Sequence, residues 1–430
     1  TINLDLSEPQ TGPSRALFFY NLELDSEGTE NNKFTMGGAI TCTNNLTITD
    51  GEIDTGSNHA LSVGVGVADG TSGLLVGSGG TLTCNSSAVE VNGLKTTGGT
   101  VTLPDSSGSF TVKGTAHSGY GIHDTSGSGN IVHSSGTVTW DTGGLSTIQA
   151  KSTFNNITTA TSGTDMRWFD SLTLAGALTV AANTDVFEHA SAGGNLTITG
   201  AVSVSGKLGN SDAYSAYEFG SLTIESGGEY HATDGTTTCN GNVNVKSSGT
   251  FTHNDGTFLW ENTTGDSITG FGAGAPAFYN LEISSSTSND IFPEWDFTVR
   301  NVFDTNVQQI WIHPNSRDVT ITMGFSDATA VSTGATTAGL KTGGYINSTL
   351  KSYQNHLNDI KIYGASQVYH AKLADAWLTF THTSQADCTW YIKNLNVQST
   401  FNTTHTAKTG SNAIIILDED CEFAAFDVTS

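Results

Sequence analysis

The sequence predicts an all-β protein, a parallel β-helix (β-solenoid) with degenerate repeats of about 130 residues. The segment Phe19–Glu23 recurs letter for letter at Phe278–Glu282, and a looser copy, Phe154–Ile157, lies between them. The starts of the copies are 135 and 124 residues apart, from 19 to 154 and from 154 to 278. Alternating polar and apolar segments and closely spaced strand starts are the other observations that predict this fold class.

A second repeated element predicts where large core residues lie. The segment His133–Asp141 matches His253–Glu261, with Gly, Thr and Trp at equal positions. Residues that repeat with the structural unit usually pack in the same way, so we expect Trp140 and Trp260 to fill the core or to stack between coils. The alternative for this pair is a repeated binding surface.

Short strands follow one another along the chain. They alternate Val, Leu, Ile or Phe with Thr or Ser, which is typical of a strand with one buried face. The clearest are Phe169–Leu174, Ala177–Val180, Asn195–Thr199, Ala201–Ser205 and Phe219–Ile224. Gly, Asn and Asp fill the gaps as turn residues. Three such strands and their turns form one coil of a parallel β-helix, and the coils stack about 4.8 Å apart. An array of antiparallel β-sandwich units is the alternative.

The repeats divide the sequence into three units. Residues 1–150 form the first unit, 151–276 the second, and 277–430 a third, degenerate unit with an aromatic-rich C-terminal part. The third holds four of the seven Trp residues, which predicts either a cap on the end of the solenoid or a binding surface for a sugar or a partner. The segment Ser348–Ile360 reads as one short helix or as a loop between strands.

Composition excludes several partners. The chain of 430 residues has 16 Lys and Arg against 41 Asp and Glu, a formal net charge of −25. Nucleic acid and anionic membrane surfaces require a basic face, so neither is an expected partner. No apolar run approaches the roughly 20 residues of a membrane helix, so membrane insertion is not expected. The chain starts at Thr1 without a basic-then-apolar leader, so we expect processing or an upstream segment.

The five Cys residues predict buried thiols rather than a metal site. Cys42, Cys84 and Cys239 each follow Thr in a Thr-rich strand, where a lone Cys acts as a small apolar residue. No Cys-x-x-Cys pair exists, so no zinc site is expected. Cys388 and Cys421 lie in the last unit, and whether they form a disulfide is left open.

The repeated elements resemble those of a known class of proteins. The series Gly136–Asp141, Ser146–Ile148, Phe154–Ile157 and Leu172–Val180 is similar to repeats in tail-fibre-like and other structural proteins of bacteriophages, and to repeats in large secreted bacterial surface proteins. The resemblance covers residues 15–300. It implies a non-enzymatic extracellular structural or adhesion protein, with the virion surface or the cell exterior as its location.

Candidate functional residues lie mainly in the last unit. Asp418, Asp420 and Glu422 form the densest acidic cluster, which is either a solvated turn or a Ca²⁺ site, and no other cofactor is expected. Trp377, Trp390 and Tyr391 are candidates for a partner or glycan surface. His117 and His123 flank a Gly-rich loop and are interpreted as surface residues, since neither has a third ligand nearby in the sequence.

No nucleotide-binding or hydrolase motif is present in the sequence. What the resemblance implies first is a phage virion fibre, spike or decoration protein that presents a rigid β-solenoid. Its partners would be copies of itself, other virion or surface subunits, or a host glycan. The alternatives are a secreted cell-surface filament, sheath or adhesin subunit, and a polysaccharide-degrading tailspike.

Overall fold

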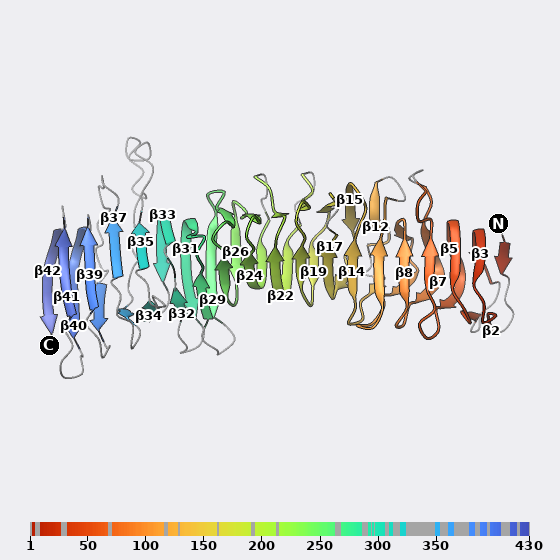
Figure 1. Cartoon of the computed structure of the whole chain (residues 1–430), viewed down its shortest axis with the longest axis horizontal. Coiled ribbons are helices and arrows are strands. Elements are labelled where there is room, and N and C mark those ends of the chain that lie inside the picture. Colours follow the sequence, from red (N-terminus) through yellow and green to blue (C-terminus); the bar gives the residue numbers. More distant parts are fainter. Residues whose placement is uncertain are drawn as a thin grey trace. The chain divides into compact units, whose positions relative to one another are not determined.

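The computed structural model confirms the parallel β-solenoid and excludes the antiparallel sandwich array. The strand pairings of the described residues are parallel, and each strand lies beside the strand of the next coil (Figure 1). No helix occurs among the described residues. The described residues are 2–4, 9–26, 32–67, 71–115, 119–127, 130–160, 163–190, 194–211, 215–262, 268–285, 291–293, 295, 297–305, 309–312, 319–323, 349–352, 360–364, 378–382, 388–393, 396–405, 413–418 and 422–429, with strand backbone alone from residue 300 on.

The chain forms two compact units, residues 1–215 (unit 1) and 216–430 (unit 2). The three units predicted from sequence repeats remain a prediction. The strands of unit 1 are β1 (Ile2–Leu4), β2 (Gln10–Thr11), β3 (Leu17–Leu24), β4 (Lys33–Thr35), β5 (Ile40–Asp54), β6 (Leu61–Val63), β7 (Leu74–Thr83), β8 (Ala88–Val91), β9 (Leu94–Thr96), β10 (Thr100–Thr102), β11 (Ser109–Val112), β12 (Tyr120–Asp124), β13 (Ile131–Val132), β14 (Thr137–Trp140), β15 (Leu145–Gln149), β16 (Thr153–Phe154), β17 (Asn156–Thr159), β18 (Asp165–Trp168), β19 (Leu172–Leu174), β20 (Leu178–Val180), β21 (Asp185–Glu188), β22 (Leu196–Val204) and β23 (Lys207–Leu208).

Unit 2 continues the same construction. Its strands are β24 (Tyr217–Ile224), β25 (Glu229–His231), β26 (Thr236–Cys239), β27 (Val243–Val245), β28 (Thr250–Thr252), β29 (Thr257–Asn262), β30 (Ile268–Phe271), β31 (Ala277–Ser285), β32 (Ile291–Pro293), β33 (Phe297–Thr305), β34 (Gln309–Ile312), β35 (Val319–Met323), β36 (Thr349–Ser352), β37 (Ile360–Gly364), β38 (Leu378–His382), β39 (Cys388–Lys393), β40 (Asn396–His405), β41 (Ala413–Asp418) and β42 (Glu422–Thr429). The helix alternative for Ser348–Ile360 is wrong at both ends. Thr349–Ser352 is strand β36 and pairs with β34 and β38, and Ile360 begins strand β37.

One inward ladder of unit 1 shows how the core is built. Its rungs are Leu17, Ile40, Leu61, Val89, Phe110, Val138, Ile157, Leu178 and Val202. All but the first are buried. The spacing of the rungs along the chain is uneven, since the step from Val138 to Ile157 is shorter than the step from Leu61 to Val89. Each coil nevertheless contributes one apolar side chain to a continuous column, and apolar burial stabilises the stack coil by coil.

The neighbouring ladder faces outward and is polar after its first rung. Its rungs are Phe18, Thr41, Ser62, Glu90, Thr111, Thr139, Thr158, Thr179 and Ser203. Side chains alternate between the two faces of a strand, so the residue that follows each core residue points outward. In most coils of this ladder that residue is Thr. Thr is β-branched and suits a strand exposed on one side, which accounts for the abundance of Thr in this sequence.

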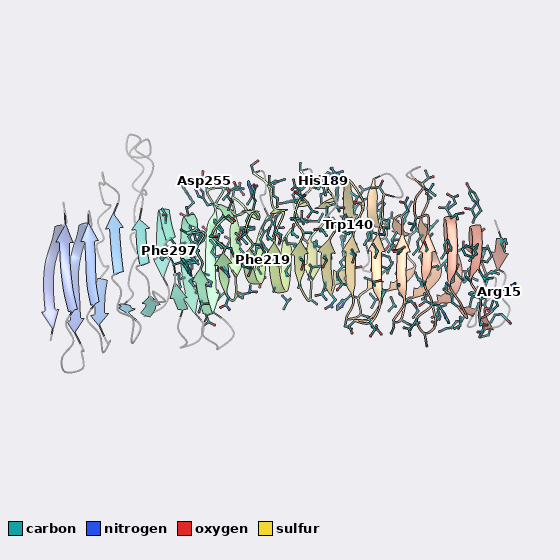
Figure 2. All side chains as sticks on the ribbon, in the orientation of Figure 1. Arg15, Trp140, His189, Phe219, Asp255 and Phe297 are labelled. Atoms are coloured by element: carbon teal, nitrogen blue, oxygen red, sulfur yellow. The ribbon has the colours of Figure 1, made fainter. Side chains whose placement is uncertain are left out.

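The two repeated Trp residues lie in the core, as predicted. Trp140 and Trp260 are fully buried. Each packs against a glycine. A Cβ atom added to Gly121, one coil before Trp140, would lie 2.7 Å from the Trp140 ring, and one added to Gly270, in the next strand of the coil that holds Trp260, would lie 3.2 Å from the Trp260 ring. Figure 2 shows the labelled Trp140 within the coils of unit 1 and His189 at their margin. The equal positions in the sequence therefore both correspond to buried core positions.

Asparagine side chains tie successive coils together at the corners. The Asn156 Oδ1 accepts a hydrogen bond from the Ala177 N–H (2.7 Å), and the Asn242 Oδ1 accepts one from the Thr269 N–H (2.8 Å). The Asn45 Oδ1 accepts the Gly73 N–H in the same way (2.9 Å). Each Asn precedes an inward Leu, Ile or Val, so an Asn followed by an aliphatic residue marks a corner of the coil.

Replacing Asn156 with alanine is expected to destabilise unit 1 by about 1–2 kcal/mol, because the Ala177 N–H would lose its acceptor. Hydrogen exchange of the 172–180 segment should accelerate in this variant. The Asn156→Asp variant keeps an acceptor oxygen and should exchange as slowly as the parent protein. Equal exchange of the alanine variant and the parent protein would show that the corner bond contributes nothing.

Candidate functional site

Four of the six candidate residues in the predicted third unit are placed, and only by their backbone. Trp390 and Tyr391 lie in β39, opposite Ile415 and Ile416 of β41. Asp418 ends β41 opposite Lys393, and Glu422 begins β42. Trp377 and Asp420 lie outside the described residues. The glycan surface and the Ca²⁺ site at these residues therefore remain predictions.

Histidines and acids do not gather into a metal site in the part of the chain that the structure describes. His123 is half-buried and stacks on Tyr120, with ring centroids 4.2 Å apart. Burial, together with the nearby Lys95 charge, lowers the pKa of His123. His117, its predicted companion on the loop, lies outside the described residues.

The three Thr-linked cysteines are buried, as predicted. Cys42, Cys84 and Cys239 are free thiols enclosed in the core. Burial raises the pKa of Cys42 and of Cys239 to about 12, and it also raises the pKa of Cys84. Since the thiolate is the reactive form, these residues act as core side chains and not as nucleophiles. Cys388 is placed only as backbone of β39 and Cys421 lies outside the described residues, so their pairing stays open.

These thiols are expected to resist alkylation by iodoacetamide at about pH 8 in the folded chain and to react fully in denaturant. Peptide mapping by mass spectrometry would distinguish the three sites from Cys388 and Cys421. Rapid labelling of Cys84 in the native chain would contradict its place in the core.

Lysines on the outer face of unit 1 sit between carboxylates. The Lys33 Nζ lies 3.2 Å from the Glu52 Oε1 and 2.5 Å from the Asp54 Oδ2. Burial alone would raise the pKa of Asp54, but hydrogen bonds from Lys33, the Gly56 N–H and Asn85 outweigh it and hold this pKa below its ordinary value. The lysine therefore offsets repulsion between two acids of one strand, β5, from the neighbouring coil.

The same arrangement recurs on later coils. The Lys113 Nζ lies 2.9 Å from the Asp141 Oδ2 and 3.9 Å from the Glu90 Oε1, so one cation bridges three successive coils. A hydrogen bond from Lys113 to Asp141 raises the pKa of the lysine. In unit 2, Lys246 forms an ion pair with Glu225. These three lysines are engaged in ion pairs with carboxylates of the fold.

A groove with both polar and apolar lining crosses four successive coils of unit 2. It has a volume of about 530 Å³. Thr223 of β24, Asn244 of β27 and Thr269 of β30 line it, and Asn242 and Lys246 flank β27. Trp295, which follows β32, is half-buried and also lines the groove. We call this site the Trp295 groove.

The groove forms because one rung lacks an outward side chain. The register places Thr223 beside Asn244, and Asn244 beside Phe271. Phe271 is fully buried, and its ring lies 4.6 Å from the Trp260 ring and 4.9 Å from the Phe297 ring, so it fills the core instead of the outer row. The small residues that follow it, Gly272 to Gly274, leave the outer face hollow.

The groove is held open by the backbone. Gly272 has φ of +77°, and a Cβ atom there would lie 2.4 Å from the Asn244 Oδ1. Glycine is therefore required at this point, and the Asn244 amide lies directly on the Gly272 backbone. The Asn242 Oδ1 accepts the Thr269 N–H, which fixes the second amide. The polar wall is preformed on strands rather than on a loose loop.

Sequence reasoning missed the Trp295 groove. Trp295 was expected only as one of the aromatic residues of the predicted third unit, whose surface candidates were Trp377, Trp390 and Tyr391. The usable signal is a Gly-rich segment, Thr269–Gly274, one coil after the outward pair Asn242 and Asn244. A run of glycines on a solenoid coil predicts a missing outer row at that place.

The described part of the chain contains no helix with the length and hydrophobicity needed to span a membrane. No protein-family model, no curated protein and no solved structure matches this chain.

Proposed function

We propose that this protein is a non-enzymatic structural protein of the exterior, first of all a bacteriophage virion fibre, spike or decoration protein. In this role the stacked coils act as a stiff support, and the outer faces of the coils contact neighbouring subunits or a host surface. The acidic surface keeps such particles apart and disfavours adsorption to other polyanions.

The observation that supports this proposal is the uninterrupted inward ladder of unit 1. Eight buried apolar rungs, Ile40 to Val202, follow one another without a polar break. Parallel strands whose hydrogen bonds run from coil to coil give a structure that resists bending and local opening. A continuous core of this kind serves a support better than it serves a reaction centre that must open and close.

The buried polar groups also support a structural role. The Thr55 Oγ1 donates to the Cys84 carbonyl (2.7 Å), and the Thr159 and Thr184 hydroxyls bond to each other (2.7 Å). The Thr96 hydroxyl donates to the Asp124 carboxylate (2.9 Å). Each bond joins one coil to another, so these residues contribute to stacking.

Locating the chain in its native setting tests the proposal. Quantitative mass spectrometry of purified virions, washed cell surfaces, secreted material and cytosol should find the chain in virions at a fixed copy number. Recovery on the cell surface or in secreted filaments would favour the filament, sheath or adhesin alternative instead. Recovery only in the cytosol would overturn an exterior role. In a separate assay, shortening of a host capsular polysaccharide by the purified chain would overturn the proposal that the protein is not an enzyme.

A further inference from the structure

We propose that the Trp295 groove binds a neutral, hydroxyl-rich sugar of the pyranose type, as one residue of a glycan chain. The inference rests on the proposed surface role, which would bring this face into contact with a glycan. It names a ligand class and a site in unit 2 whose residues are distinct from the acidic cluster and the aromatic candidates of the last strands.

The size and walls of the groove fit a sugar unit. Its volume of about 530 Å³ lies within the range of small-molecule sites. Trp295 supplies an aromatic wall, and the C–H face of a pyranose ring packs on such a surface while its hydroxyl groups stay wet. The side opposite an aromatic wall must then offer hydrogen bonds to the hydroxyl groups.

The polar wall offers both donors and acceptors. The Asn244 amide and the Thr223 and Thr269 hydroxyls line the groove and each can donate or accept. The Asn242 Oδ1 accepts the Thr269 N–H, so this amide can offer its Nδ2 as a donor. Sugar hydroxyls act as donor and acceptor at once and match this mixture.

The charge of the groove favours a neutral sugar over an acidic one. Lys246 is the cation that lines the groove, and it is paired with Glu225. A uronic acid, sialic acid or phosphate would have to displace that carboxylate and to approach a chain whose formal charge is −25. A neutral hexose or N-acetylhexosamine carries no such penalty.

The groove is also preorganised. Asn244 lies on Gly272, Asn242 is bonded to the β30 backbone, and the four coils are joined by strand pairing. Binding therefore requires little ordering of side chains, which preserves more of the interaction energy. Weak binding at one groove is sufficient for a surface protein that is present in many copies, because avidity multiplies it.

Isothermal titration calorimetry of the full chain tests the proposal. The probes are cellopentaose, maltopentaose, mannopentaose, chitopentaose and a galactan oligosaccharide, with polygalacturonate and polysialic acid as acidic comparators. We expect at least one neutral probe to bind and neither acidic polymer to bind. The Trp295→Ala variant should lose at least about tenfold in affinity for the neutral probe.

Three variants separate a groove effect from a folding effect. Ala273→Tyr places bulk in the groove at an exposed position without removing a polar partner, and it should also lower affinity at least about tenfold. Trp295→Phe keeps an aromatic wall and should retain most of the affinity. Tyr20→Ala removes an exposed aromatic residue of unit 1 and should change nothing.

The results that would overturn the sugar site differ from the results that would overturn the proposed function. If no neutral probe binds, if only acidic polymers bind, or if Trp295→Ala and Ala273→Tyr bind as the parent does, the groove is not a neutral sugar site. The chain can still be found on virions in each of those cases. Conversely, the chain could bind a sugar in the groove and yet be found only in the cytosol. That result would support the sugar site and overturn the exterior role.

Discussion

Replacing Trp260 with alanine is expected to lower the free energy of unfolding of unit 2 by about 3–5 kcal/mol. The indole is fully buried, its ring lies 4.6 Å from Phe271, and its Nε1 donates to the Gly241 carbonyl at 2.8 Å. The substitution removes this packing and the hydrogen bond together. Hydrogen exchange of β29 and β31, measured on the full chain, should rise toward the rate of an open coil.

A pair of milder variants tests the reason for that loss. In the described part of unit 1, the Trp140 indole N–H has no acceptor, whereas Trp260 has Gly241. Trp260→Phe should therefore cost about 1 kcal/mol more than Trp140→Phe. The exposed Tyr20→Ala serves as the control and should stay within about 0.5 kcal/mol of the parent. An equal cost for the two Trp→Phe variants would show that packing alone matters.

Replacing Leu178 with aspartate is expected to disrupt the stack of unit 1, at a cost above about 4 kcal/mol. Leu178 is fully buried and lies between Ile157 and Val202 in the inward ladder. A carboxylate there would have no partner in an apolar column. Thermal unfolding and hydrogen exchange of β17, β20 and β22 should report the loss.

The matched control lies one residue along the same strand. Thr179 is exposed and lies between Thr158 and Ser203 in the outward ladder. Thr179→Asp should change stability by no more than about 0.5 kcal/mol. Similar costs for Leu178→Asp and Thr179→Asp would contradict the assignment of faces in β20.

The fold class was predictable because the alternation of polar and apolar residues survives in almost every strand. In β20, Leu178, Thr179 and Val180 are buried, exposed and buried. The coil length was not predictable in the same way, since turns of different length separate the rungs. The chain between Leu61 and Val89 is longer than the chain between Val138 and Ile157, although each pair spans one coil. No fixed short period therefore appears in the sequence.

The identical copies, Phe19–Glu23 and Phe278–Glu282, do not occupy the same face of the coil, whereas the looser copy Phe154–Ile157 matches the third copy in its place. In the second and third copies, Asn156 lies opposite Thr137 and Asn280 lies opposite Thr257, and Thr137 and Thr257 each begin the strand that carries the repeated Trp. In the first copy, Asn21 instead lies opposite Asn45, at another corner of the coil. The shared residues encode a corner, where Asn bonds to the next coil, and a corner can occur between any two faces.

The candidate site could not be read from the sequence because four successive coils build it, the last of them through Trp295. Thr223, Asn244 and Phe271 belong to three different strands that are far apart along the chain, and only the register brings them together. Whether Phe271 points outward or into the core depends on its contacts with Trp260 and Phe297. Sequence reasoning detects composition, such as the aromatic residues of the last unit, more readily than the absence of a side chain.

Electron cryomicroscopy of the native assembly that contains this chain tests the central claim most directly. We expect stacked coils about 4.8 Å apart, attached to the outside of a virion, with the outer Thr ladder facing solvent or a neighbouring subunit. The chain in a free cytosolic particle, or coils packed so that the inward ladder from Ile40 to Val202 is exposed, would contradict the account.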